Sequence, residues 1–177
     1  MSAVMSPAIH ATTMSTPIGP LTLLASDGRV CAGGFTDDVG HLACFIRRKH
    51  GTAQIEVVDD LGPITEALAS YFDGELAALD RIPVSVQGGA FQERVWAALR
   101  EIPPGTPTTY HALAGKLGGQ KLARAVGMGC ATNPIAPIIP CHRVTGSGGN
   151  LTGYYWGLTR KRWLLDHERR HARVAGG

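Results

Sequence analysis

The residues best suited to chemistry are Cys141, His142 and Arg143, which follow one another directly in the sequence. They end the segment NPIAPIIPCHR, residues 133–143, in which three prolines oppose a helix and an apolar run leads into the cysteine. A free thiol titrates at about 8.5, so at neutral pH it is mostly protonated unless a base or a positive charge assists it. The pattern therefore predicts a nucleophile at Cys141 with His142 as its base. The alternative is a buried structural cysteine, the interpretation that fits the remaining cysteines, Cys31, Cys44 and Cys130.

A histidine base needs an acceptor on its second ring nitrogen to orient it, and Glu168 is the best candidate. It lies in TRKRWLLDHERRH, residues 159–171, which reads as a terminal helix. Glu168 follows Leu164 by four residues and Leu165 by three, so on a helix it faces the core with them. The alternative is an exposed carboxylate among the arginines of a charged helix.

Two short helices are predicted at residues 110–117 and 121–131, separated only by a Gly-Gly-Gln turn, which is the spacing of a helix-turn-helix. On the second helix the apolar positions share one face and Arg124 points away from it. The small residues beside it, among them Ala123 and Gly127, leave room for another molecule to approach. A DNA backbone is one candidate. The alternative is an ordinary exposed arginine, and from this segment alone we favour it.

Charge is distributed unevenly along the 177 residues. Residues 1–90 carry 5 Lys and Arg against 10 Asp and Glu, a net −5, whereas residues 91–177 carry 12 against 4, a net +8. A basic second half indicates a polyanionic partner or simply a basic surface. A hydrophobic fraction of 44% with 18% charged residues excludes a disordered chain, and the scattered cysteines exclude a dense disulfide framework and a structural zinc cluster.

The remaining pattern predicts an α+β fold in which a small amino-terminal sheet-and-helix subdomain, residues 1–88, precedes a mostly helical subdomain, residues 89–177. A hairpin is expected at residues 20–35 because Asp27 and Gly28 form a good turn between two apolar runs. The other expected elements are a helix at 38–49, a strand at 55–58, a helix at 64–72, an extended segment at 80–86 and a helix at 91–102 that ends at Pro103.

The opening residues MSAVMSPAIHATTM lack the basic and apolar regions of a secretion signal, and no apolar stretch approaches the roughly 20 residues of a membrane span. We therefore expect a cytoplasmic protein with reduced thiols and no membrane partner.

The segment Pro140-Cys141-His142-Arg143-Val144 resembles the active-site signature of the O6-alkylguanine-DNA alkyltransferases, the methylated-DNA–protein-cysteine methyltransferases. Other matching segments are FQERVWAALREIPPGTPTTY, ARAVG at residues 123–127, Asn133-Pro134, Gly153-Tyr154 and residues 161–168. The resemblance is dense over residues 87–168 and weak before them, where TPIGPLTL carries it. In its closing loop, Tyr154-Tyr155-Trp156-Gly157, the chain is most similar to the carboxy-terminal domain of the bacterial adaptive-response protein.

The resemblance implies direct DNA repair. On this resemblance a methyl or small alkyl group passes irreversibly from O6-alkylguanine, with O4-methylthymine as a second candidate substrate, in a flipped-out nucleotide to the protein's own cysteine, so each molecule reacts once. No cofactor and no metal are implied. The partner is double-stranded DNA, bound through its minor groove by a monomer.

Roles carry over to the matching positions. Cys141 is then the nucleophile, His142 a base acting through water, Glu168 its orienting partner, Asn133 the residue that pins the turn, and Tyr110 the donor to the guanine ring.

The resemblance also assigns DNA and substrate contacts. Arg124 fills the gap left by the flipped base, on a helix that approaches DNA through Ala123 and Gly127. The carbonyls of Cys141 and Val144 accept the guanine amino group. The closing loop, Tyr154, Tyr155 and Trp156, completes the pocket, with a Tyr155 N–H directed at the guanine oxygen. Trp156 is expected to narrow the pocket, so that methyl is preferred over benzyl.

Three other functions fit parts of the pattern. A non-catalytic alkyl-lesion-binding protein is disfavoured because Cys141 is present. A cysteine hydrolase built on Cys141, His142 and Glu168 leaves the basic helix-turn-helix without a task. A helix-turn-helix transcription factor does not explain the proline-bracketed cysteine.

Overall fold

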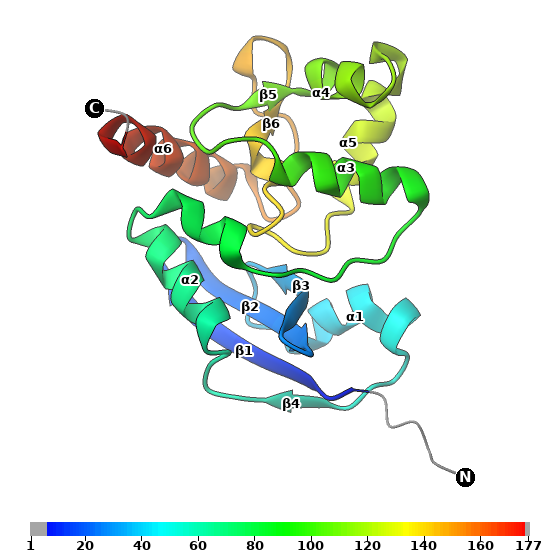
Figure 1. Cartoon of the computed structure of the whole chain (residues 1–177), viewed down its shortest axis with the longest axis vertical. Helices are drawn as coiled ribbons and strands as arrows, with labels where there is room; N and C mark the ends of the chain where they lie inside the picture. Colours follow the sequence, from blue (N-terminus) through cyan, green and yellow to red (C-terminus); the bar gives the residue numbers. More distant parts are fainter. Residues whose placement is uncertain (1–6, 176–177) are drawn as a thin grey trace.

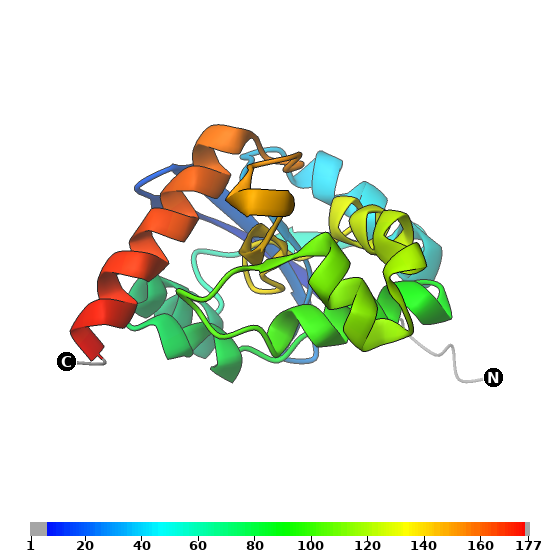
Figure 2. The same cartoon turned by 90° about the horizontal axis from the view of Figure 1, so that it is seen from above.

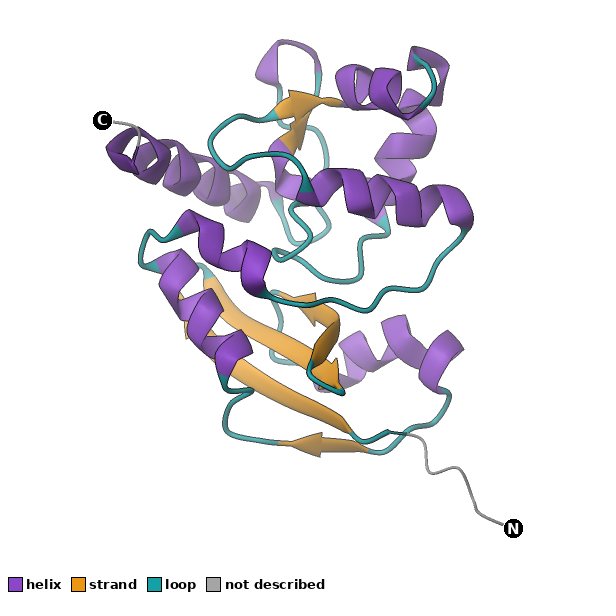
Figure 3. Cartoon of the chain, in the orientation of Figure 1, coloured by secondary structure: helices purple, strands orange, loops and turns teal. Residues whose placement is uncertain are grey.

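The first half of the chain builds a four-stranded sheet in the order β3-β2-β1-β4 (Figures 1 and 3). The strands are β1 (Ile9–Thr16), β2 (Gly19–Ser26), β3 (Arg29–Gly34) and β4 (Ile55–Val57). β1, β2 and β3 are antiparallel neighbours, and β4 lies parallel to β1. The computed structural model describes residues 7–175, so residues 1–6, on which the expected lack of a secretion signal partly depends, lie outside the described part.

The predicted hairpin is β2–β3. Asp27 and Gly28 at its turn both have positive φ, 50° and 73°, as a two-residue turn between twisted antiparallel strands requires. Strand β1 was not predicted. Its sequence, IHATTMST, has only two large apolar side chains, Ile9 and Met14, although its threonines favour a strand.

Alternation along β2 distributes its side chains to two layers. Leu21, Leu23 and Ala25 join the main core with helix α2 (Pro63–Phe72), while Leu24 joins a smaller cluster beneath helix α1 (Val39–His50). The two helices therefore cover opposite faces of the sheet, as Figure 1 shows.

The second half is mostly helical. It contains α3 (Ala90–Arg100), α4 (Tyr110–Leu117), α5 (Ala123–Ala131) and α6 (Leu158–Ala175), with short parallel strands β5 (Thr108–Thr109) and β6 (Val144–Thr145). Seen from above, α6 runs along one edge and the α4–α5 pair lies at the other (Figure 2). The predicted α+β class is confirmed by this arrangement.

Two predicted boundaries are wrong. The extended segment expected at 80–86 begins instead inside a 3-10 helix, η1 (Leu76–Arg81), because buried Leu76 and Leu79 pack into the core and the Arg100 guanidinium binds the Leu79 and Ile82 carbonyls. The second helix of the helix-turn-helix is preceded by a 3-10 turn, η2 (Gln120–Leu122), so the α-helix proper starts at residue 123.

The two halves share one core. The main cluster runs from Leu21 and Leu23 in β2 through Val95 and Leu99 in α3 to Leu164 in α6. The free edge of β3 also binds the segment that leads to Cys141. The Gly33 N–H donates to the Pro134 carbonyl at 2.9 Å, and the Gly33 carbonyl accepts from the Ala136 N–H at 3.0 Å. The sheet thus positions the segment that carries the candidate nucleophile. Within residues 7–175, no helix is both long and apolar enough to cross a membrane.

Candidate active site

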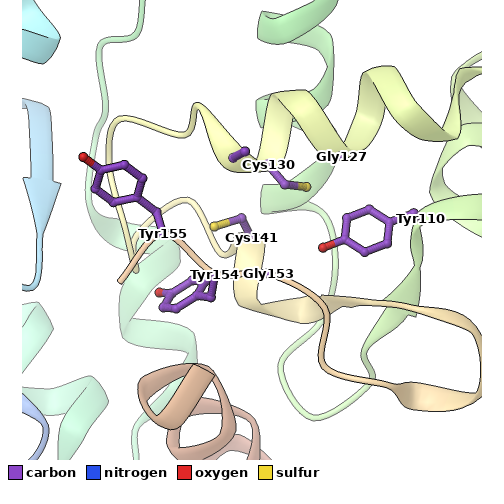
Figure 4. A pocket seen from close by; sticks show the side chains of 8 residues that line it. Tyr110, Gly127, Cys130, Cys141, Gly153, Tyr154 and Tyr155 are labelled. Atoms are coloured by element: carbon purple, nitrogen blue, oxygen red, sulfur yellow. The ribbon is translucent and has the colours of Figure 1, made fainter. Parts of the chain in front are cut away.

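A small cavity of about 140 Å³ opens where α4, α5 and the loop before α6 meet (Figure 4). Ligand pockets commonly measure roughly 300–1,000 Å³, so this one has room for little beyond a compact group. Its lining residues are Tyr110, Gly127, Cys130, Ala131, Cys141, Gly153, Tyr154 and Tyr155.

Cys141 begins a single 3-10 turn, η3 (Cys141–Arg143), after the proline-rich segment. Asn133 holds this segment: its amide N–H donates to the Ile139 carbonyl at 2.7 Å, and its Oδ1 accepts from Ile135 N–H at 3.0 Å. The Cys141 side chain faces the cavity and is only 7% exposed. Burial raises the pKa of the Cys141 thiol, and Asn133 and Lys161 act in the opposite direction. The resting group is therefore a thiol, and the neighbouring Arg143 guanidinium is engaged with Glu168.

His142 is fully buried beside Glu168, with Nε2 2.7 Å from the Glu168 Oε1. A carboxylate only accepts hydrogen bonds, so His142 carries its proton on Nε2 and leaves Nδ1 as the basic nitrogen. Nδ1 is buried and has no hydrogen-bond partner among the described residues. Burial, aided by the charges of Arg143 and Lys161, lowers the pKa of His142 although Glu168 acts in the opposite direction, and this keeps the imidazole neutral and able to take up a proton.

Glu168 faces the core, as its helical position predicts, and the alternative of an exposed carboxylate is wrong. Its Oε1 accepts from Arg143 Nη2 at 2.9 Å and from the Tyr71 hydroxyl at 2.9 Å, besides its contact with His142. Burial alone raises the pKa of Glu168, but His142 and Arg143 outweigh it and hold the pKa well below its usual range. The carboxylate thus stays ionised and fixes the imidazole.

Two residues in this network were not predicted. Tyr71 comes from α2 in the amino-terminal half, 97 residues before Glu168, and a lone tyrosine in an apolar helix was its only sequence signal. Lys161 is almost fully buried, and its Nζ donates to the Gly153 carbonyl at 3.1 Å and lies 5.9 Å from the centre of the Tyr110 ring. It ties α6 to the loop that lines the cavity.

Tyr110 reaches the cavity from the start of α4, with its hydroxyl directed toward Cys141 (Figure 4). The hydroxyl donates to the Thr152 carbonyl at 3.2 Å. Burial raises the pKa of Tyr110, so the phenol remains a donor at neutral pH. Cys130, interpreted from sequence as purely structural, also lines the cavity, and burial raises the pKa of its thiol strongly.

The other predicted residues fall into three places. Arg124 is exposed on the outer face of α5, Ala123 is half-buried there, and Gly127 lines the cavity. Val144 is fully buried directly after η3. Tyr154 and Tyr155 line the cavity, and the buried Tyr154 hydroxyl has no partner among the described residues.

Trp156 does not line the cavity, which corrects the expectation that its ring narrows the pocket. Its indole packs over β3, where a Cβ on Gly34 would lie 2.0 Å from Trp156 Cζ2. Because Gly34 has no side chain, the Trp156 ring can pack there. Tyr155, and not Trp156, forms the wall of the cavity.

Comparison with known proteins identifies the family of the chain. The family models for 6-O-methylguanine DNA methyltransferase match in two parts, the ribonuclease-like domain over residues 9–86 and the DNA binding domain over residues 90–170. The methylated-DNA–protein-cysteine methyltransferase of Salmonella typhimurium is 40% identical over 159 residues, 88% of this chain and 92% of that protein. The same-named protein of Mycobacterium bovis is 40% identical over 167 residues, 93% and 94% of the two chains.

Solved structures show the same fold. The crystal structure of Mycobacterium tuberculosis OGT in complex with DNA superposes with a TM-score of 0.77 at 36% identity and covers 92% of this chain and 94% of that one. The M. tuberculosis O6-methylguanine methyltransferase gives a TM-score of 0.76 at 34% identity with the same coverage. The resemblance predicted from the residues is therefore confirmed, and the chain belongs to the 6-O-methylguanine DNA methyltransferase family.

Proposed function

We propose that this protein repairs O6-alkylguanine in double-stranded DNA by moving the alkyl group onto Cys141. The observation that carries the proposal is a buried cysteine that shares a small cavity with Tyr110 and precedes a histidine oriented by a carboxylate. Relatives that are 40% identical over most of the chain bear the name of that activity. Alkylation of a single thiol ends the reaction, because a thioether does not hydrolyse, and each molecule acts once.

The reaction needs a thiolate only at the moment of attack. As substrate enters, His142 Nδ1 takes the Cys141 proton through a water molecule, and Glu168 stabilises the imidazolium that forms. The sulfur attacks the alkyl carbon, a C–S bond forms, and the bond from that carbon to the guanine oxygen breaks. The electron pair of the broken bond stays on the guanine, which takes up a proton as it leaves.

Tyr110 assists the leaving group. Its hydroxyl exchanges the Thr152 carbonyl for the guanine ring and donates a hydrogen bond as negative charge develops there. The carbonyls of Cys141 and Val144 accept the guanine amino group and favour guanine over other bases. A nucleophilic thiol must stay reduced, which suits a cytoplasmic protein.

The target carbon is inaccessible in stacked DNA, so the damaged nucleotide must leave the duplex. The protein acts as a monomer from the minor groove. Helix α5 approaches the groove through Ala123 and Gly127, and exposed Arg124 fills the space of the extruded base. The net +8 charge of residues 91–177 supports binding to the phosphate backbone.

The experiment that tests this function is intact mass measurement after incubation with a duplex that carries one O6-methylguanine, followed by peptide mapping. We expect each protein molecule to gain the mass of one methylene group on Cys141, with equal loss of the lesion. Tight binding without a mass gain indicates a lesion sensor instead. If neither occurs and activated esters are hydrolysed, the protein is a cysteine hydrolase.

Replacing Arg124 by alanine should slow methyl transfer from duplex DNA by about 10-fold, because nothing then fills the gap left by the extruded base. A single strand has no such gap, so transfer from a single-stranded oligonucleotide with the same lesion should change little. Second-order rate constants on the two substrates test this. Arg29→Ala, an exposed arginine at the hairpin turn, is the matched control. Equal losses on both substrates contradict the assigned role of Arg124.

A further inference from the structure

The loop that lines the cavity, residues 153–157, is held by the amino-terminal half of the molecule. The Tyr155 hydroxyl lies 2.8 Å from His41 Nε2 on α1, a hydrogen bond between residues 114 positions apart. The rings of His41 and Phe45, both on α1, contact Tyr155 with centroids 6.0 and 5.9 Å away, respectively. Helix α1 therefore meets the loop through aromatic side chains, outside the part of the molecule that carries Cys141.

Trp156 anchors the same loop beside this contact. Its ring packs on Gly34 and lies 5.8 Å from the His41 ring and 4.7 Å from the Tyr155 ring. The Trp156 carbonyl accepts from Arg160 Nη1 at 3.0 Å, and the Nε of Arg160 donates to the Ile18 carbonyl at 2.8 Å. These contacts fix the backbone of the loop. The position of the Tyr155 side chain then depends on its contact with His41.

Tyr155 connects this anchor with the reacting group. Its ring lines the cavity that contains Cys141, while its hydroxyl points away from Cys141 (Figure 4). The side chain is 55% exposed, so packing alone does not hold the ring, and the hydrogen bond to His41 is its polar restraint. Any alkyl group transferred to Cys141 must occupy the space that this ring bounds.

We propose that His41 is a positioning residue that sets the size of alkyl group the cavity accepts, by holding the ring of Tyr155 as its wall. The inference rests on the proposed alkyl transfer to Cys141 and assigns the amino-terminal half a part in substrate selection. A fixed ring admits methyl and obstructs a benzyl-sized group. A released ring swings outward, where it is already partly exposed, and opens the cavity.

The test compares second-order rate constants for transfer from duplexes carrying O6-methylguanine or O6-benzylguanine. His41→Phe keeps an aromatic ring against Phe45 and Trp156 but removes the hydrogen bond. We expect it to raise the benzyl rate by about 3- to 10-fold, the range for one net hydrogen bond, and to leave the methyl rate nearly unchanged. Tyr155→Phe removes the other partner of this hydrogen bond and should raise the benzyl rate by a similar factor. The double variant should raise it no further than either single variant.

Two further variants separate positioning from general structure. His41→Gln retains a side-chain donor and acceptor and should restore most of the preference for methyl. His10→Phe changes a histidine on β1 that pairs with Glu56 at 3.6 Å, and it should alter neither rate. Equal changes in the methyl and benzyl rates of His41→Phe, additive effects in the double variant, or no change at all overturn the inference. A wild-type protein that accepts neither alkyl group contradicts the proposed function instead.

Discussion

Cys141→Ala is expected to abolish methyl transfer completely while leaving binding to a duplex with O6-methylguanine intact. The variant removes the sulfur that forms the new bond, and the η3 turn holds no other thiol. Only a small buried side chain changes, so the cavity and the exposed face of α5 persist. Intact mass and loss of lesion measure transfer, and a gel-shift titration measures binding.

Cys130→Ala is the matched control, because Cys130 is a second buried thiol in the same cavity. Burial raises the pKa of Cys130, and among the described residues no histidine forms a hydrogen bond with its thiol, so we expect it to remain unreactive. This variant should still accept one methyl group per molecule on Cys141. A methyl group found on Cys130 in either protein would contradict the assignment of Cys141 as the sole acceptor.

Residues near the cysteine could be predicted as a group because local rules govern them. The prolines exclude a helix before Cys141, and the η3 turn then places His142 next to it. Glu168 could be predicted from helical phase alone, since a position three and four residues after two leucines must face the core. The hairpin followed from the conformational preference of Asp27 and Gly28.

Contacts between distant segments could not be predicted in this way. Tyr71 and Glu168 are 97 residues apart, and His41 and Tyr155 are 114 apart, so only the packing of the sheet against the second half brings them together. The Trp156 ring packs against β3 because Gly34 has no side chain there. The sequence of the closing loop alone does not predict this contact. Composition indicated that the loop is bulky but not which ring forms the wall.

Glu168→Gln is expected to slow methyl transfer by about 100-fold and to destabilise the fold by about 3–5 kcal/mol. The amide has nearly the shape of the carboxylate but lacks its charge, so the guanidinium of Arg143 stays buried without a counterion. The amide also fails to hold the Nε2–H form of His142 reliably. Rate constants and urea unfolding at about pH 7 measure the two effects. Asp166→Asn, which affects an exposed ion pair with Arg169 on the same helix, is the control and should change each by little.

The stabilisation from Glu168 should also depend on pH in a defined direction. Because its pKa in the folded protein lies well below the usual value of about 4.3, the unfolded chain binds a proton first as the pH falls. The contribution is therefore complete above about pH 5 and is lost progressively as the pH decreases toward the folded pKa. His142 should also lower the free energy of unfolding as the pH falls below about 6.5. Burial lowers its pKa in the folded protein, so the unfolded chain binds this proton first. Between about pH 5 and 3 the free energy of unfolding should fall more steeply for the wild type than for Glu168→Gln, and parallel curves would exclude an ionised Glu168 as the source of that stability.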